Sequence, residues 1–103
     1  MSKISKISIL IPCYNEEKTI RQVIINAEKS LININLDYEI IVVDDHSNDG
    51  SSKKLLELKN DNKIKLFTHS HNQGKGAAIA TGLKYISGEI ILIQDADLEY
   101  DPE

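Results

Sequence analysis

Short runs of apolar residues alternate along this chain with stretches in which apolar residues recur every three or four positions. The apolar runs at 6–11, 39–43, 64–67 and 90–93 predict four strands. Helical spacing predicts one helix from about 15 to 32, a second that begins near 49–51 and a third from about 76 to 86. The predicted order of elements is therefore β-α-β-α-β-α-β.

Capping and breaking residues set the predicted limits of these elements. Pro12 is expected to end the first strand because proline cannot donate to a sheet ladder. Asn15 is expected to cap the first helix, and Gly88 to end the third. The apolar faces predicted for the three helices are Ile20, Val23, Ile24, Ala27 and Leu31, then Leu55, Leu56 and Leu58, then Ile79, Leu83 and Ile86.

The predicted strands lack polar alternation, which is typical of a parallel sheet covered by helices on both faces. With right-handed crossovers, the expected fold is a Rossmann-like three-layer α/β/α sandwich with four parallel strands in the order 3-2-1-4. The 103 residues suit one domain over 1–103. Ligands of such sheets bind beyond the carboxyl ends of the strands, where the winding reverses.

Three polar clusters follow the predicted strands, at 12–16, 44–45 and 95–97. The last contains Asp95 and Asp97, with Glu99 and Asp101 close behind. Two unit charges 4 Å apart repel by roughly 4 kcal/mol at an effective dielectric near 20, so a cation would relieve such a cluster. Mg²⁺ or Mn²⁺ suits all-oxygen ligands. A solvated acidic turn is the alternative that the residues alone leave open.

The other polar segments allow two interpretations each. One of Asp44 and Asp45 can accept a hydrogen bond from a base, and we expect the other to be structural. The loop at 72–76 offers backbone N–H groups and a lysine to an anion, although a flexible loop that caps the third helix is favoured. We expect His46, His69 and His71 to be solvated. Without a partner base, Cys13 is expected to be a small strand-end residue rather than a nucleophile.

Composition narrows the class of partner. The net charge of −4 argues against nucleic acid and against an anionic membrane surface. The segment before Pro12 is too short for a signal-peptide core or a membrane span, and the single cysteine suits a reducing compartment. We therefore expect a cytoplasmic protein, at the inner face of the membrane in a full-length form.

Taken together, the segments resemble the amino-terminal half of family 2 glycosyltransferases, which have the nucleotide-sugar-binding fold called GT-A. The matching stretches span most of the chain: Ile11-Pro-Cys-Tyr-Asn-Glu16, Ile41-Val-Val-Asp-Asp-His-Ser-Asn-Asp-Gly50, Asn72-Gln-Gly-Lys-Gly-Ala-Ala78 and Gln94-Asp-Ala-Asp-Leu-Glu-Tyr-Asp-Pro-Glu103. The form Asp-Ala-Asp-Leu-Glu is most similar to the dolichol- and polyprenyl-phosphate mannosyl- and glucosyltransferases.

The resemblance implies a donor, a cofactor and a set of binding residues. The donor would be a UDP- or GDP-hexose and the acceptor a polyprenyl phosphate, with Mg²⁺ or Mn²⁺ as cofactor. Asp95 and Asp97 match the family's DxD motif, and Glu99 falls where some members add a further metal ligand. Asp45 and the Val43 backbone would contact the base. The implied nucleotide-binding residues are Pro12, Tyr14, Glu16, Val43, Asp45, Lys75, Gly76, Asp95 and Ala96.

Length is the main departure from the family, whose members continue well past the DxD motif to the acceptor site and the catalytic base. We therefore expect a truncated, nucleotide-binding half with no base that can be named, which binds nucleotide weakly and turns over no sugar donor. We also expect self-association through the exposed edge of the strand at 90–93. The alternatives are a phosphotransfer or phosphohydrolase domain with an acidic magnesium site, and a non-catalytic nucleotide-binding module.

Overall fold

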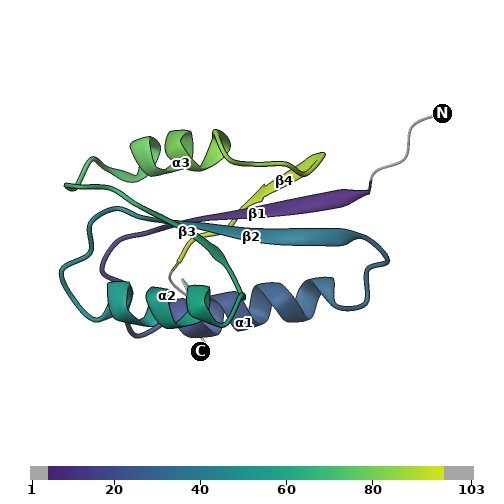
Figure 1. Cartoon of the computed structure of the whole chain (residues 1–103), viewed down its shortest axis with the longest axis horizontal. Helices are drawn as coiled ribbons and strands as arrows, with labels where there is room; N and C mark the ends of the chain where they lie inside the picture. The colour runs from purple at the N-terminus through teal and green to yellow at the C-terminus, as the bar shows by residue number, and fades with distance from the viewer. Residues whose placement is uncertain (1–4, 97–103) are drawn as a thin grey trace, which may run out of the picture.

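The computed structural model describes residues 5–96, in which four parallel strands form one sheet. The strands are β1 (Lys6–Cys13), β2 (Asp37–Asp44), β3 (Lys65–Thr68) and β4 (Ile90–Ile93). The helices are α1 (Ile20–Leu31), α2 (Ser51–Asn60) and α3 (Lys75–Leu83). Figure 1 shows α1 and α2 on one face of the sheet and α3 on the other. The predicted three-layer sandwich and its strand order, β3-β2-β1-β4, are confirmed.

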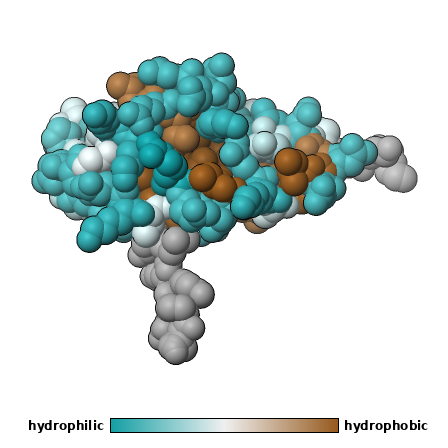
Figure 2. Space-filling model, turned by 90° about the horizontal axis from the view of Figure 1, so that it is seen from below, coloured by the Kyte–Doolittle hydropathy of each residue, from teal (hydrophilic) through white to brown (hydrophobic). Residues whose placement is uncertain are grey.

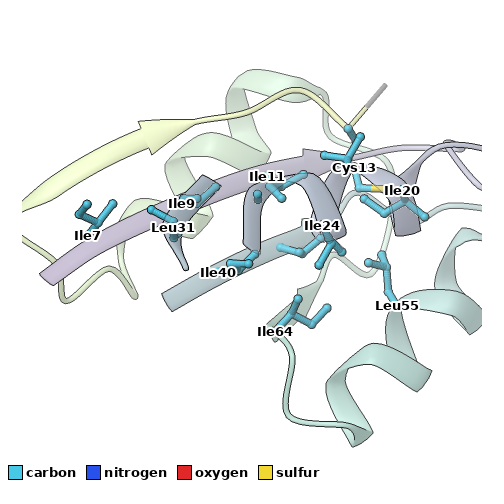
Figure 3. Close-up of a cluster of buried hydrophobic side chains, with 14 residues drawn as sticks. Ile7, Ile9, Ile11, Cys13, Ile20, Ile24, Leu31, Ile40, Leu55 and Ile64 are labelled. Carbon is cyan, nitrogen blue, oxygen red and sulfur yellow. The ribbon is translucent and has the colours of Figure 1, made fainter. Parts of the chain in front are cut away.

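The larger part of the core lies between the sheet and the α1–α2 layer. The predicted apolar stripe of α1 is buried throughout. Alternate residues of the central strands β1 and β2 pack against this stripe, because successive side chains of a strand point to opposite faces. Figure 3 shows this cluster, which includes Ile7, Ile9, Ile11, Ile20, Ile24, Ile40, Leu55 and Ile64.

The α3 side of the sheet holds a smaller cluster, in which α3 lies very close to β1. Leu10, Ile41 and Val43 pack there against Ala78. A Cβ added at Gly82 would lie 2.1 Å from a methyl carbon of Leu10, so only glycine allows this approach.

Proline does not end the first strand, as the sequence had suggested. β1 continues through Pro12 to Cys13, which pairs with Asp44. The Cys13 carbonyl accepts from the Asp45 N–H, on the β2 side, whereas the Leu10 carbonyl accepts from Gln94 on the β4 side. Bonding in a parallel strand alternates between sides, so the nitrogen of Pro12 faces the β4 side. Pairing with β4 extends only to Leu10, and no ladder bond is lost.

The first helix begins at Ile20, not at Asn15 as predicted. Asn15 has a φ of 53°, outside the helical range. Its N–H donates to Ser47 Oγ at 2.9 Å, and its Oδ1 accepts from the Asn48 N–H at 2.9 Å. Asn15 therefore ties the segment before α1 to the loop after β2 instead of capping a helix.

The third helix ends at Leu83, earlier than predicted. The Tyr85 N–H donates to the Gly82 carbonyl, and the Tyr85 ring stacks on Phe67 of β3 with centroids 3.9 Å apart. The helix turns Ala78 and Gly82 toward the sheet, so Leu83, which the sequence placed on the apolar face, is exposed. Leu56 of α2 is likewise exposed.

β4 has the composition of a central strand but lies at the edge of the described sheet. It pairs with β1 on one side, and within residues 5–96 no strand pairs with its other side. Ile91, Leu92 and Ile93 are 43%, 48% and 52% exposed. The exposed edge that the sequence predicted for this strand is therefore present.

The surface over α1 and α2 is mostly hydrophilic, interrupted by a few hydrophobic areas (Figure 2). No helix in the described part of the chain is long and apolar enough to cross a membrane.

Candidate functional site

A cavity of about 420 Å³ opens at the carboxyl ends of the central strands. Most of the residues that the sequence singled out line it: Pro12, Tyr14, Glu16, Asp45, Lys75, Asp95 and Ala96. Cys13, Asn72, Gly74 and Ala78 complete the lining. Val43 and Gly76, which the resemblance also implied, are not among the lining residues. Val43 is instead buried against α3. The three polar clusters separated in sequence therefore meet at one site.

Asp45 lies at the floor of the site, just beyond β2, and is 2% exposed. Its Oδ1 accepts from His69 Nδ1 at 2.7 Å and from the Gln73 N–H at 2.9 Å. Its Oδ2 accepts from the Gly74 N–H at 2.8 Å and from Asn72 Nδ2 at 3.1 Å. A carboxylate has about four acceptor positions, so groups of the protein itself fill the capacity of Asp45.

This bonding keeps the Asp45 carboxyl ionised. Burial by itself would raise its pKa, but hydrogen bonds from Gln73, His69 and Gly74 outweigh burial and hold the pKa below its usual value. A base N–H can therefore reach Asp45 only by replacing one of these donors. The Asn72 amide is the least costly to replace, because it makes the longest of the four bonds and belongs to an exposed side chain.

One of the two aspartates was predicted to be structural, and Asp44 is that residue. Its Oδ1 accepts from the Ser47 N–H at 3.0 Å and its Oδ2 from Ser52 Oγ at 2.7 Å. Asp49 then accepts from the Ser51 N–H at 2.8 Å at the start of α2. These bonds shape the loop between β2 and α2.

His69 was expected to be solvated, and that prediction is wrong. It is 8% exposed, with Nδ1 on Asp45 and Nε2 2.7 Å from Thr81 Oγ1. Its partners lie 24 and 12 positions away in the sequence, so the local pattern around His69 carries no sign of its burial.

The loop at 72–74 is not the unattached cap that the sequence favoured. Asp45 holds it through two backbone N–H groups and the Asn72 side chain. Gly74, with a φ of 101°, lies in the region that favours glycine, and α3 begins at the next residue. The loop thereby presents Asn72 and Lys75 to the cavity. The sequence signal that could have revealed this role was the Asn-Gln-Gly-Lys motif itself.

The opposite wall comes from the segment between β1 and α1. Tyr14 is 43% exposed and offers its ring to the cavity. The Glu16 N–H donates to Ser51 Oγ at 2.8 Å, and the Glu17 carboxylate accepts from the Gly50 N–H at 2.9 Å. These contacts fix the wall against the amino-terminal end of α2.

Cys13 forms part of the lining but is a poor nucleophile. Burial and the nearby Asp44 raise the pKa of its thiol to about 12, so the reactive thiolate is scarce at neutral pH. This agrees with the interpretation of Cys13 as a strand-end residue.

Asp95 and Ala96 follow β4 and close the third side of the cavity. Lys75 Nζ donates to Asp95 Oδ1 at 2.5 Å, and both side chains are exposed. The Ala96 carbonyl accepts from Thr19 Oγ1 at 2.8 Å, which anchors the segment after β4 beside α1.

The described residues fit a divalent ion in part. Asp95 offers one exposed carboxylate at the cavity, and the Lys75 ammonium neutralises it. One carboxylate can be enough, because Mg²⁺ usually takes only one or two carboxylates beside phosphate oxygens. No group of three or more potential ligands occurs within residues 5–96. The other expected ligands, Asp97 and Glu99, lie outside the described residues, as does Asp101.

Residues 8–103 match the family model described as glycosyl transferase family 2. The chain belongs to glycosyltransferase family 2. One family member, the undecaprenyl-phosphate 4-deoxy-4-formamido-L-arabinose transferase of Proteus mirabilis, is 39% identical over 98% of this chain. The dolichol-phosphate mannosyltransferase of Pyrococcus furiosus is 35% identical over 95% of it. This chain spans only 32% and 27% of the lengths of these two relatives.

Solved structures agree with the family assignment. S. aureus TarS in complex with UDP matches with a TM-score of 0.77 at 30% identity, over 89% of this chain and 27% of that one. A mannosyltransferase from Pyrobaculum calidifontis, in complex with GDP-Man and Mn²⁺, matches with a TM-score of 0.76 at 26% identity, over 93% of this chain and 28% of that one. The fold is therefore that of the GT-A glycosyltransferases.

Proposed function

We propose that this chain forms the nucleotide-sugar-binding part of an inverting hexosyltransferase. The donor is a UDP- or GDP-hexose and the acceptor is a polyprenyl phosphate. The observation that carries the proposal is the cavity in which the side chains of Tyr14, Lys75 and Asp95 meet at the carboxyl ends of parallel strands. The relatives named for undecaprenyl phosphate and dolichol phosphate support the choice of acceptor.

Each wall of the cavity suits one part of such a donor. The exposed ring of Tyr14 offers a surface on which a base can stack. A base N–H can bond to the Asp45 carboxylate where the Asn72 amide now donates. The Lys75 ammonium, at the start of α3, suits a diphosphate. Pro12, Glu16 and Ala96 complete the proposed nucleotide pocket, with Val43 and Gly76 contributing backbone behind it.

The metal site is proposed at the acidic segment that begins with Asp95. Asp95 and Asp97, with Glu99, would hold Mg²⁺ or Mn²⁺, and three of the matching solved structures contain one of these ions. When bound, the ion supplies positive charge that offsets the charge on a departing diphosphate. The contribution of Asp95 itself would be to hold the ion at the cavity.

The proposed reaction forms a bond between an acceptor phosphate oxygen and C1 of the sugar. The bond between C1 and the diphosphate oxygen breaks, and the nucleoside diphosphate leaves with the electron pair. An acceptor phosphate is already anionic, so a strong protein base is unnecessary. We assign no catalytic residue within this chain, and we place the reaction of a full-length form at the cytoplasmic face of the membrane, where nucleotide sugars are available.

A ligand screen separates this proposal from its alternatives. The chain is incubated with UDP-hexose, GDP-hexose and acetyl phosphate, each in the presence of Mg²⁺ or Mn²⁺, and followed by native and denaturing mass spectrometry. We expect a non-covalent complex with one nucleotide sugar and no covalent adduct. A phosphoryl adduct from acetyl phosphate would instead support a phosphotransfer domain. Nucleotide binding without turnover, in a chain extended to the length of the relatives, would support a non-catalytic module.

A further inference from the structure

The side chains of Asp45, His69 and Thr81 form a continuous hydrogen-bonded chain behind the cavity, in which Asp45 and His69 are buried and Thr81 is partly buried. His69 lies just after β3, and Thr81 lies in the second half of α3. The two bonds of the imidazole are both 2.7 Å long. Neither His69 nor Thr81 lines the cavity. Two good bonds at a buried ring fix its orientation, because any rotation leaves a polar atom unpaired.

The direction of the first bond follows from the partners of Asp45. The carboxylate accepts from two backbone N–H groups, so it is an acceptor toward the ring as well. Nδ1 of His69 therefore carries a hydrogen and donates to Asp45 Oδ1. The Thr81 hydroxyl can serve Nε2 as donor or as acceptor, so the ring is satisfied on both sides.

The consequence reaches the cavity through Asp45. His69 fixes Oδ1, and the same carboxylate holds the N–H groups of Gln73 and Gly74. Those two residues lead directly into Lys75 at the first position of α3. Thr81 connects the ring to the same helix from its other end. The imidazole is thus connected to the start of the segment 73–81 through Asp45 and bonds directly to Thr81 at its end.

We infer that His69 is a positioning residue of the nucleotide site: by orienting Asp45 and α3 together, it sets the place of the 72–75 loop in the cavity. This inference rests on the proposed function, because the loop matters for binding only if a nucleotide sugar enters the cavity. His69 itself touches no ligand. Its removal changes affinity by releasing the Asp45 carboxylate and, through Gln73 and Gly74, Lys75 from their fixed positions.

Two substitutions of His69 separate the bond to Asp45 from the bond to Thr81. The amide of His69→Asn can reach Asp45 in place of Nδ1, whereas the amide of His69→Gln extends to the position of Nε2 and serves Thr81. Thr81→Val keeps the shape of Thr81 and removes its hydroxyl. The probe is the nucleotide sugar that the wild-type chain binds with Mn²⁺, titrated calorimetrically, with folding of each variant checked by circular dichroism.

We expect His69→Gln to weaken binding about tenfold, equivalent to 1.4 kcal/mol. His69→Asn should recover most of this loss, and Thr81→Val should fall between the two. If His69 contributed only to stability, both His69 variants would melt at lower temperature and the folded protein would keep wild-type affinity. That result would overturn the inference.

An amide readout on the ligand-free chain distinguishes failure of this inference from failure of the proposed function. In His69→Gln we expect faster hydrogen exchange and shifted NMR resonances at Gln73 and Gly74, and in His69→Asn near wild-type values. Unchanged amides in His69→Gln would refute the positioning role, whether or not a nucleotide binds. If the Gln73 and Gly74 amides change in His69→Gln but the wild-type chain binds no nucleotide sugar, the coupling of His69 to the loop stands. The proposed function of the cavity would then be overturned.

Discussion

Lys75 and Asp95 meet across the mouth of the cavity, with Nζ 2.5 Å from Oδ1. The pair connects the first residue of α3 to the segment that follows β4. The lysine ammonium thereby neutralises the carboxylate that the resemblance assigns to a metal ion. An exposed ion pair contributes only about 0–1 kcal/mol, so a divalent ion and a diphosphate can separate these two side chains at little cost.

This relationship predicts opposite effects of Lys75→Gln on two ligands. Mn²⁺ alone should bind about two- to fivefold more tightly, since its competitor is removed and an exposed pair is worth roughly 0.5–1 kcal/mol. The nucleotide diphosphate should bind more weakly, because its phosphates lose a cation. Both affinities can be measured by titration calorimetry.

Lys84→Gln is the matched control for that experiment. Lys84 lies at the other end of α3, is exposed and does not line the cavity. It carries the same charge as Lys75, so a general effect of net charge would appear equally in both variants. Equal behaviour of Lys75→Gln and Lys84→Gln would contradict the proposed exchange of Lys75 between Asp95 and the diphosphate.

A second prediction concerns stability in acid and depends on Glu39, at the opposite end of the sheet. Burial alone would raise the pKa of Glu39, but hydrogen bonds from Lys65, Ser8 and Ser87 lower it to about 2. The two shortest are 2.6 Å from Ser8 Oγ and 2.7 Å from Lys65 Nζ. The folded state therefore binds the proton less well than the unfolded state, whose carboxyl keeps the ordinary value of about 4.3.

The contribution of Glu39 is accordingly complete above the unfolded-state pKa and is lost as the pH falls toward 2. Glu39→Gln should lower the free energy of unfolding at pH 7 by about 1–3 kcal/mol and leave a smaller difference from wild type at pH 3. Urea unfolding at both pH values measures this. Glu57→Gln, which removes the partner of Arg21 in an exposed pair, should have little effect at either pH. A constant difference between Glu39→Gln and wild type across this range would refute the assignment.

A third prediction contrasts two glycines of α3. Gly82→Ala forces a methyl group against Leu10 and should destabilise the fold by about 1–3 kcal/mol. A Cβ at Gly76 meets nothing within 4 Å, so Gly76→Ala should stabilise the helix by about 0.5–1 kcal/mol. Thermal and chemical unfolding distinguish the two. Similar effects of the two substitutions would mean that α3 does not lie as close to β1 as described.

A fourth prediction concerns the exposed edge of β4, which we propose as a self-association surface. Apolar side chains, together with backbone groups that no strand within residues 5–96 pairs, favour pairing with a second copy of this chain. Multi-angle light scattering should detect dimers or larger species that grow with concentration. Ile91→Lys should restore the monomer, because a charge at an edge opposes pairing.

Leu56→Lys provides the comparison, since Leu56 is 50% exposed on α2, away from the sheet edge. It removes a similar apolar area without touching β4. A monodisperse wild-type monomer at high concentration would contradict the proposal. So would an equal effect of Leu56→Lys and Ile91→Lys, because association would then follow general hydrophobicity rather than the strand edge.

Much of the fold was predictable because its determinants are local or periodic. The stripe on α1 follows from the spacing of Ile20, Val23 and Ile24, and the strand order follows from the alternation of elements and the hand of their connections. The convergence of Tyr14, Asp45 and Asp95 on one cavity was predictable in turn, because parallel strands end at the same edge.

What escaped prediction depends on contacts between distant residues. Asn15 does not cap α1, because it hydrogen-bonds instead to Ser47 and Asn48, which lie more than 30 positions away in the sequence. The burial of His69 requires Asp45 and Thr81 together. Pro12 remains in β1 because β4 stops pairing before it. In each case the residue has the local preference that the prediction used, but hydrogen bonds or geometry set by distant residues override it.

The most direct test of the central proposal is a calorimetric titration of the chain with UDP- and GDP-hexoses, with and without Mn²⁺. We predict binding of one of these nucleotide sugars that depends on the metal. Asp95→Asn and Asp97→Ala should each weaken it about tenfold or more, since a hydrogen-bonded or metal-bound charge is worth more than about 1.4 kcal/mol. Asp61→Asn, at the end of α2, should leave it unchanged. No binding of either donor in the presence of Mn²⁺, or equal affinity in wild type and Asp95→Asn, would contradict the proposal.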